Sequence, residues 1–304
     1  MYAKELRRKL RAQAACCLPA LLAAMPQGMG RELCAGLGWL GFWWVGRDRR
    51  LARANLERVY PDWPAERVEA TARAVFKELG RNVYDFLRYP DLPETDRRDL
   101  IRLEGTEVLE AVRGQDRGAV IVTGHFGSWE ILAAQLVALG NPLMAMARPI
   151  KEPRLEDLLS RHRERMGVRT FPSSRSPLAP LRHLRAGGFL GVLVDQRVRS
   201  GGTVVRFLGR PTRMTDAPAR LALAAHVPLV VVTIRRLSDH RHHACVRPPI
   251  EPNGTPAALT QQLASILETE IRDCPEQWMW FHPRWTERDD ALLLAAKEPA
   301  CAAR

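Results

Sequence analysis

A histidine is followed five residues later by a glutamate in the stretch VIVTGHFGSWE, residues 120–130. An imidazole can take a proton from a hydroxyl near neutral pH, and a carboxylate bound to one ring nitrogen makes the other more basic. On a continuous helix the two side chains would lie about 140° apart. They can meet if His125 lies in a loop and Glu130 lies in the first turn of the next helix. We therefore predict that His125 and Glu130 form a catalytic pair in which Glu130 orients His125.

This pair would be a general base without a nucleophile of its own. The sequence has no G-x-S-x-G stretch that would place a serine on a strand-to-helix turn. The nucleophile is then most simply a hydroxyl of the substrate. The pattern is short, so two simpler interpretations stay open: a loop histidine bound to the backbone, and a carboxylate that merely favours a helix start.

Alternating apolar runs and helical patterns predict the elements that hold this pair. Short apolar runs indicate strands at 119–123, 143–147, 190–194, 228–234 and 243–248. Helical spacing indicates helices at 63–89, 105–114, 129–139, 152–165, 176–186, 216–226 and 256–272, with Thr106 and Ser128 as helix caps. The alternation predicts an α/β fold with a mostly parallel central sheet flanked by helices.

Four further polar residues are candidates for substrate binding. Arg148 follows a strand and precedes a proline, so it can bind a phosphate or stabilise an oxyanion at the carboxyl edge of the sheet. Asp195 and Gln196 end another strand at the same edge, unless they only form a turn. Arg220 lies in a predicted helix, where a solvated surface arginine is the alternative.

The amino-acid composition restricts the kinds of partner that we predict. The 304 residues include 46 Lys+Arg against 34 Asp+Glu, a net charge of +12, which favours an anionic partner unless the arginine content has no partner behind it. No nucleic-acid-binding signature is present, so we predict no nucleic acid partner. The six cysteines include no C-x-x-C pair, which favours reduced thiols in a cytosolic setting. His240, His242 and His243 cluster beside Asp239, but the segment resembles a turn between strands and we predict no metal site.

The first 60 residues combine basic and apolar segments. A basic start is followed by a charge-free stretch at 12–30 that prolines and glycines interrupt. A second apolar stretch carries Trp39, Trp43 and Trp44 before several arginines, a combination typical of the membrane–water interface. We predict membrane-associated helices at 1–60, a catalytic domain at 61–290 and an alanine-rich tail at 291–304. A single weak anchor span, or tryptophans in an ordinary core, are the alternatives.

Several segments resemble one family in the order in which they occur. TGHFGSWE resembles the H-x4-D/E motif of glycerolipid and lipid A acyltransferases. MARPIKEPRLEDLLSRHRERMGVRTFP, GGFLGVLVDQRV, VRFLGRPTRMTDAPARLALAAHVPLVVV and PEQWMWFHPRW are similar to successive segments of the late lipid A biosynthesis acyltransferases, the lauroyl and myristoyl transferases of Gram-negative bacteria. The resemblance covers roughly residues 35–290. Ser128, where asparagine is commoner, and Ala147, where an aromatic often stands, depart from the family pattern.

The resemblance implies a reaction and its partners. A fatty acyl chain would pass from an acyl carrier protein thioester to a hydroxyl of a lipid A precursor at the cytoplasmic face of the inner membrane. No cofactor and no covalent acyl-enzyme would be needed. Another glycolipid, an ornithine lipid or a polyene-type lipid are alternative acceptors. A basic membrane-binding protein without catalysis is a further alternative, which would not need His125 or Glu130.

Overall fold

The computed structural model describes residues 22, 25–148, 150, 152–172 and 177–285 of the chain. The basic start of the chain and the predicted tail at 291–304 lie outside the described residues.

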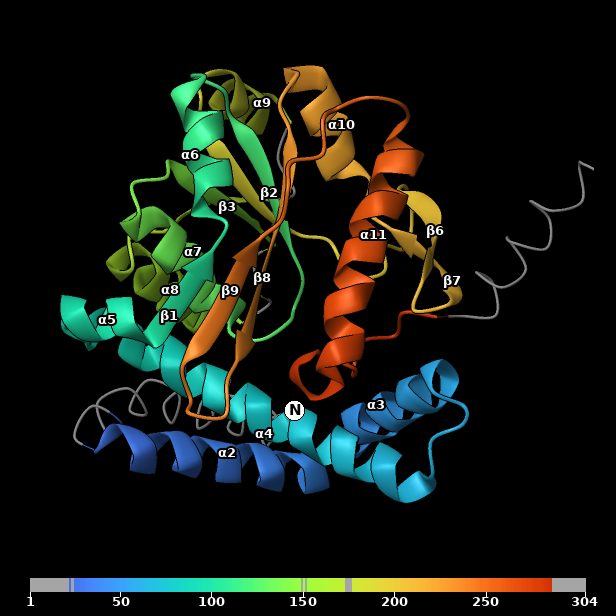
Figure 1. The fold of residues 1–304 in the computed structure, drawn as a ribbon. Helices are drawn as coiled ribbons and strands as arrows, with labels where there is room; N and C mark the ends of the chain where they lie inside the picture. Colours follow the sequence, from blue (N-terminus) through green and yellow to red (C-terminus); the bar gives the residue numbers. More distant parts are fainter. Residues whose placement is uncertain (1–21, 23–24, 149, 151, 173–176, 286–304) are drawn as a thin grey trace, which may run out of the picture.

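A seven-stranded sheet with the order β1-β9-β8-β2-β5-β3-β4 forms the centre of the molecule (Figure 1). Its strands are β1 Ile101–Glu104, β2 Ala119–Thr123, β3 Leu143–Ala147, β4 Arg169–Pro172, β5 Phe189–Leu193, β8 Leu229–Arg236 and β9 His242–Val246. Every neighbouring pair is parallel except β8 and β9. A separate antiparallel hairpin joins β6 Thr203–Phe207 to β7 Arg210–Met214. The predicted mostly parallel sheet is confirmed.

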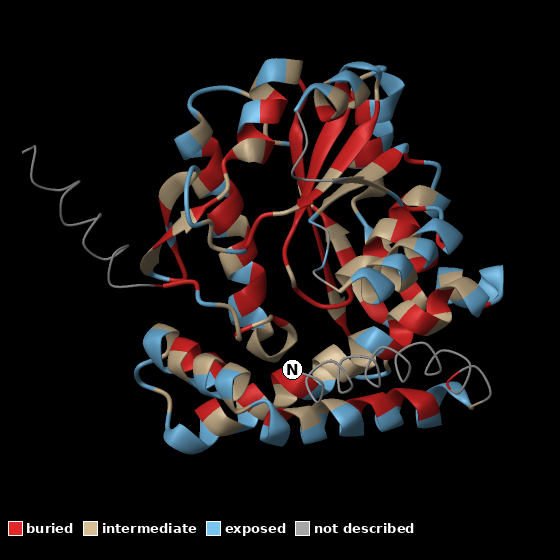
Figure 2. Ribbon diagram, turned by 180° about the vertical axis from the view of Figure 1, so that it is seen from behind, coloured by how far each residue is buried: buried red, intermediate tan, exposed pale blue. Residues whose placement is uncertain are grey.

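Helices flank the sheet. They are α2 Gln27–Trp44, α3 Gly46–Val59, α4 Ala65–Arg88, α5 Glu94–Leu100, α6 Thr106–Gly114, α7 Trp129–Ala138, α8 Pro153–Arg165, α9 Leu178–Arg185, α10 Ala217–Ala225 and α11 Pro256–Asp273, with short 3-10 turns at Tyr89–Asp91 and Pro275–Gln277. Alternate side chains of β2 enter two different cores, Val120 and Val122 in one and Ile121 in the other. A strand covered on both faces has this pattern, and Figure 2 shows the buried central strands.

Of the two predicted helix caps, Thr106 is wrong by one residue and Ser128 is confirmed in position. Thr106 is the first residue of α6, and Gly105 holds the cap position with a left-handed φ of 79° that favours glycine. Ser128 does stand at the N-cap of α7, but its side chain makes no capping hydrogen bond.

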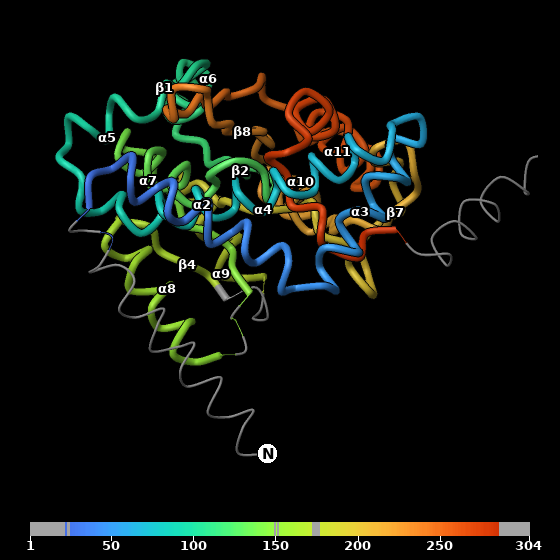
Figure 3. Tube along the Cα trace, turned by 90° about the horizontal axis from the view of Figure 1, so that it is seen from below, coloured from blue at the N-terminus to red at the C-terminus, as the bar shows by residue number. Residues whose placement is uncertain are grey.

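The second apolar stretch of the N-terminal region forms one helix, α2, which packs along α4 on the side away from the sheet (Figures 1 and 3). Their backbones approach closely: a Cβ at Gly38 would lie 2.1 Å from the carbonyl oxygen of Phe76, and one at Gly80 2.1 Å from that of Cys34. Two glycines therefore fix how α2 sits on α4.

The outer side of α2 exposes large apolar side chains. Trp39, Trp43 and Trp44 are 40%, 45% and 86% exposed. The alternative that these tryptophans belong to an ordinary core is therefore wrong. Within the described residues, no helix combines the length and the hydropathy needed to cross a membrane.

Candidate active site

His125 lies just beyond the carboxyl end of β2, in the loop that leads into α7. Two backbone hydrogen bonds tie this loop to the C-terminal segment. The Met279 amide donates to the His125 carbonyl (3.2 Å), and the Gly127 amide donates to the Gln277 carbonyl (2.9 Å). Gly127 has a φ of 55°, and a Cβ there would lie 1.9 Å from the carbonyl oxygen of Ile234. This close approach to β8 requires glycine.

The partner of His125 is Asp195, which follows the neighbouring strand β5. Nδ1 of His125 lies 2.7 Å from Oδ1 of Asp195, and the His125 backbone amide donates to Oδ2 at 2.9 Å. Gly124 makes this contact possible, since a Cβ there would lie 3.2 Å from Cγ of Asp195. Two adjacent parallel strands thus bring together residues that are 70 positions apart in the sequence.

Asp195 is buried and takes two further hydrogen bonds. Trp278 Nε1 donates to Oδ2 at 2.7 Å, and Arg284 Nη2 donates to the same oxygen at 3.3 Å. Burial alone would raise the pKa of Asp195, but the charges of His125 and Arg284 and the hydrogen bonds from His125 hold it well below its usual range. Because the carboxylate stays ionised, Nδ1 of His125 carries a proton and donates a hydrogen bond to Asp195.

The side chain of His125 is 18% exposed, and its other nitrogen contacts the exposed residue Gln196. Gln196 Nε2 lies 3.2 Å from Nε2 of His125 and 3.1 Å from Nε2 of His282. Burial, with the charges of Arg284 and His125, lowers the pKa of His282 to about 4, so this second imidazole is neutral at neutral pH. Since Nδ1 of His125 carries the proton, its Nε2 is an acceptor, as a general base requires. In this structure Nε2 accepts a hydrogen bond from the Gln196 amide.

The predicted hydrogen bond between His125 and Glu130 is wrong. The carboxylate of Glu130 is bound in two-point fashion by Arg163 of α8, at 2.9 Å to Nε and 2.5 Å to Nη2. Glu130 lies in the first turn of α7, as expected, but it joins α7 to α8. The carboxylate that binds His125 is that of Asp195.

The four predicted substrate-binding residues lie in different environments in the structure. Asp195 is fully buried behind His125, so it does not face a substrate. Gln196 is exposed and lies beside His125. Arg148 is exposed just after β3, at the edge where His125 lies, whereas Arg220 is exposed on α10 and pairs with Asp216 one turn away. Substrate binding by Gln196, Arg148 and Arg220 stays a prediction.

An apolar cavity of about 340 Å³ includes in its wall Trp129, a neighbour of the histidine. The ring of Trp129, which lines the cavity, lies 5.2 Å from the His125 ring between centroids. The other lining residues come from α4, the start of α7, and the α8 region: Leu79, Asn82, Val83, Phe86, Leu87, Ser128, Glu130, Ile150, Leu155, Leu158 and Leu159. The Glu130–Arg163 pair holds two of these walls together.

Residues of the C-terminal segment were missed by the sequence reasoning as partners of His125. Trp278, His282 and Arg284 surround the His125–Asp195 pair, and the guanidinium of Arg284 lies 3.8 Å from the centre of the Trp278 ring. The only signal in the sequence was the aromatic PEQWMWFHPRW segment, which contributed only to the family resemblance.

The histidine cluster at 240–243 is dispersed. His242 is buried with Nε2 2.9 Å from Asp85, and His243 pairs with Glu104 at 3.0 Å. Among the described residues, no group of three His, Cys, Asp or Glu side chains could hold a metal ion.

Comparisons with known proteins show the family of the chain. A family model of bacterial lipid A biosynthesis acyltransferases matches residues 5–287. The lipid A biosynthesis palmitoleoyltransferase of Escherichia coli (strain K12) is 28% identical over 250 residues, covering 80% of each chain. The phosphatidylinositol mannoside acyltransferase of Mycobacterium tuberculosis (strain CDC 1551 / Oshkosh) is 27% identical, covering 77% of this chain and 76% of its own. The lipid A biosynthesis lauroyltransferase of E. coli K12 is 23% identical, covering 90% of each chain.

The family resemblance drawn from the ordered motifs is therefore confirmed, and the alternative of a binding protein without catalysis is not supported. The extent of the match, from residue 5 to residue 287, includes the sheet, the His125 loop and the C-terminal segment that surrounds Asp195. The chain is an acyltransferase, and it belongs to the bacterial lipid A biosynthesis acyltransferase family.

Proposed function

We propose that this enzyme transfers a fatty acyl chain from an acyl carrier protein thioester to a hydroxyl of a lipid A precursor, with His125 as the general base. One observation carries the proposal. Asp195 fixes one nitrogen of His125, the other nitrogen contacts the exposed residue Gln196, and Trp129 beside the imidazole ring lines an apolar cavity.

The reaction follows from this geometry. Nε2 of His125 takes the proton of the acceptor hydroxyl as its oxygen bonds to the thioester carbonyl carbon. The tetrahedral intermediate then collapses, the C–S bond breaks, and the departing thiolate takes the proton from the imidazolium. Asp195 stays ionised throughout and stabilises the imidazolium, which supports general-base assistance of roughly 10²–10⁴-fold.

Gln196 must release Nε2 of His125 before the hydroxyl can occupy it. The side chain has a neutral alternative partner in His282, 3.1 Å away, so the release leaves one of its hydrogen bonds intact. We propose that the acceptor hydroxyl displaces the Gln196 amide from His125. This gives Gln196 a substrate-facing role that Asp195 lacks.

The cavity and the net charge suggest the donor. Its lining is mostly apolar, as an acyl chain requires, and includes Trp129, whose ring packs against that of the base. Acyl carrier protein is acidic and lipid A precursors carry phosphates, so the net charge of +12 would steer both to the protein. Arg148, exposed at the same edge of the sheet, is the proposed phosphate or oxyanion contact, and Arg220 is a proposed surface contact for an anionic partner.

Association with the inner membrane is proposed through α2 and the start of α3. The exposed tryptophans of α2 lie next in sequence to Arg47, Arg49 and Arg50, so aromatic rings and cations can both reach a layer of anionic headgroups. This would hold the enzyme at the surface where its acceptor lies.

The test is acyl transfer by the purified protein. Acyl carrier protein loaded with chains of different lengths is offered with a lipid A precursor that has free 3-hydroxyacyl groups, and mass spectrometry scores a single added acyl mass. A phosphatidylinositol mannoside is the second acceptor, because the relatives named for the two acceptors match about equally well. A gain on neither acceptor, with folding intact, would refute the proposal; a gain on the mannoside alone would change the acceptor.

A further inference from the structure

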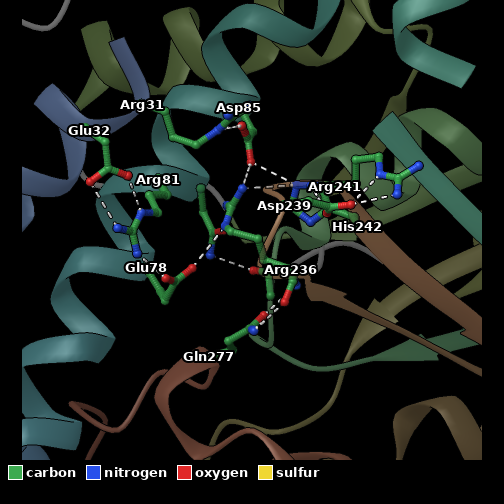
Figure 4. A network of polar contacts seen from close by, with 12 residues as sticks. Arg31, Glu32, Glu78, Arg81, Asp85, Arg236, Asp239, Arg241, His242 and Gln277 are labelled. Carbon is green, nitrogen blue, oxygen red and sulfur yellow. Dashed lines mark hydrogen bonds and ion pairs between the residues drawn. The ribbon is translucent and has the colours of Figure 1, made fainter. Parts of the chain in front are cut away.

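A buried polar network behind the His125 loop centres on Arg236, at the end of β8. Its guanidinium donates to Glu78 (3.0 Å), to Asp85 (2.6 Å) and to Oδ1 of Asn82 (2.7 Å), all on α4. Figure 4 shows Arg236 between Glu78, Asp85 and Gln277. The side chain of Arg236 is buried, so its orientation is fixed by these contacts.

The same arginine is linked to the amide and to the carbonyl of Gly127 through two intermediate residues, Asn82 and Gln277. Asn82 Nδ2 donates to the Gly127 carbonyl at 2.8 Å, and Arg236 holds the other end of the Asn82 amide. The Gly127 amide donates to the Gln277 carbonyl, and the side chain of Gln277 exchanges two hydrogen bonds with the backbone of Arg236, at 2.7 and 2.9 Å. Gly127 lies two residues after His125, so its two backbone groups set the direction of the loop.

We propose that Asn82 is a positioning residue for acyl transfer, which acts through the Gly127 carbonyl on the placement of His125. The inference rests on the proposed function and names a residue of α4 that the motif around His125 does not include. Asn82 also lines the cavity. The substitution must therefore separate positioning of the loop from binding of the acyl chain.

Replacing Asn82 by aspartate changes only the amide nitrogen of the side chain to an oxygen. In Asn82→Asp, one carboxylate oxygen still accepts from Arg236, and the new charge strengthens that contact. The other oxygen now faces the Gly127 carbonyl, acceptor against acceptor, and pushes the loop away. Asn82→Ala removes the donor without creating this repulsion. A displacement of about 1 Å can cost about 10²-fold in rate.

The experiment measures kcat and KM for acyl transfer and the thermal midpoint. We expect Asn82→Asp to lower kcat by about 10-fold to about 100-fold, with KM for the acyl donor and the midpoint close to wild type. Asn82→Ala should lower kcat less than Asn82→Asp, although it removes more of the side chain.

Asn141→Asp is the matched control. Asn141 is buried whereas Asn82 is partly buried, but its Nδ2 likewise donates to a backbone carbonyl, that of Leu136 at 2.8 Å, and it lies past the far end of α7. It should lose stability and keep its kcat.

The outcomes are distinct. If wild-type protein transfers no acyl group, the proposed function fails. If wild type is active and Asn82→Asp matches Asn141→Asp in kcat, the positioning role is refuted. A rise confined to KM also overturns it, because Asn82 would then act as a cavity wall.

Discussion

Two buried aspartates have nearly the same surroundings but different positions in the molecule. Asp195 binds His125 and Arg284, whereas Asp85 binds His242, Arg236 and Arg31. The side chain of His125 is 18% exposed and lies beside the cavity, whereas that of His242 is 0% exposed. An aspartate, a histidine and an arginine therefore make a reactive site only where the second ring nitrogen is accessible; elsewhere they join helices to a sheet.

His125→Ala should have the largest effect on the reaction. Transfer should fall by roughly 10²–10⁴-fold, because the base is lost. Asp195 keeps the hydrogen bonds from Trp278 and Arg284, so the thermal midpoint should change little. Initial rates of acyl transfer and a melting curve check this. His242→Ala should behave in the opposite way, with lower stability and normal turnover per folded molecule. Equal loss of activity in both variants would contradict the comparison.

Asp195→Asn should come next. An amide is nearly isosteric with the carboxylate but does not stabilise the imidazolium, and it no longer selects the proton on Nδ1. Transfer should fall on the order of 10²-fold, less than the full contribution of the base. The measurement is kcat for purified, folded protein. Wild-type kcat would mean that Asp195 is only a structural partner.

The Asp85 site should appear in the pH dependence of stability. Burial would raise the pKa of Asp85, but hydrogen bonding to His242 and the charge of Arg236 lower it to about 2. The unfolded carboxyl has a pKa of about 3.9, so between about pH 4 and pH 2 the unfolded state binds more protons. The stabilisation is fully present above pH 4 and is lost as the pH falls towards 2.

Denaturant unfolding of wild type and Asp85→Asn across this pH range measures the effect. The variant should lose about 3–5 kcal/mol at neutral pH, because Arg236 and Arg31 lose their buried counterion. Its acid dependence should be weaker than that of wild type, with a remainder from Asp195, whose pKa is also lowered. An unchanged slope between pH 2 and 4 would show that folding does not lower the pKa of Asp85.

A third carboxylate, that of Glu130, gives the smallest expected effect. Because Glu130 binds Arg163 and not His125, Glu130→Gln and Arg163→Gln should reduce transfer to a similar degree. The double variant should be no worse than either one, with a coupling energy of about 1 kcal/mol. Steady-state kinetics of the four proteins test this. A Glu130 variant far worse than the Arg163 variant would restore direct action on His125.

Much of the fold could be predicted from local pattern. The strand at 119–123 and the helix at 129–139 correspond to β2 and α7 within a residue, because apolar periodicity determines both. The strands β1, β4 and the β6–β7 hairpin were missed, since they are short and carry polar residues such as Arg102, Arg169 and Arg213.

The site was only half predictable. His125 lies at a strand end, as its motif indicated. The fixed spacing to Glu130 suggested a local partner, whereas the real partner comes from β5 because that strand is the neighbour of β2 in the sheet. Strand order is not encoded in any one segment, and Trp278 and Arg284 lie more than 80 residues beyond Asp195.

Every face of the second half of α4 contacts another part of the molecule or lines the cavity. Gly80 and Tyr84 contact α2, Asp85 holds Arg236, and Val83 and Phe86 line the cavity. Between residues 78 and 89 only Val83 is exposed, and it faces that cavity. Such a segment offers few positions where a single substitution is neutral, so we expect its sequence to change among relatives through paired replacements, one on each of two touching surfaces.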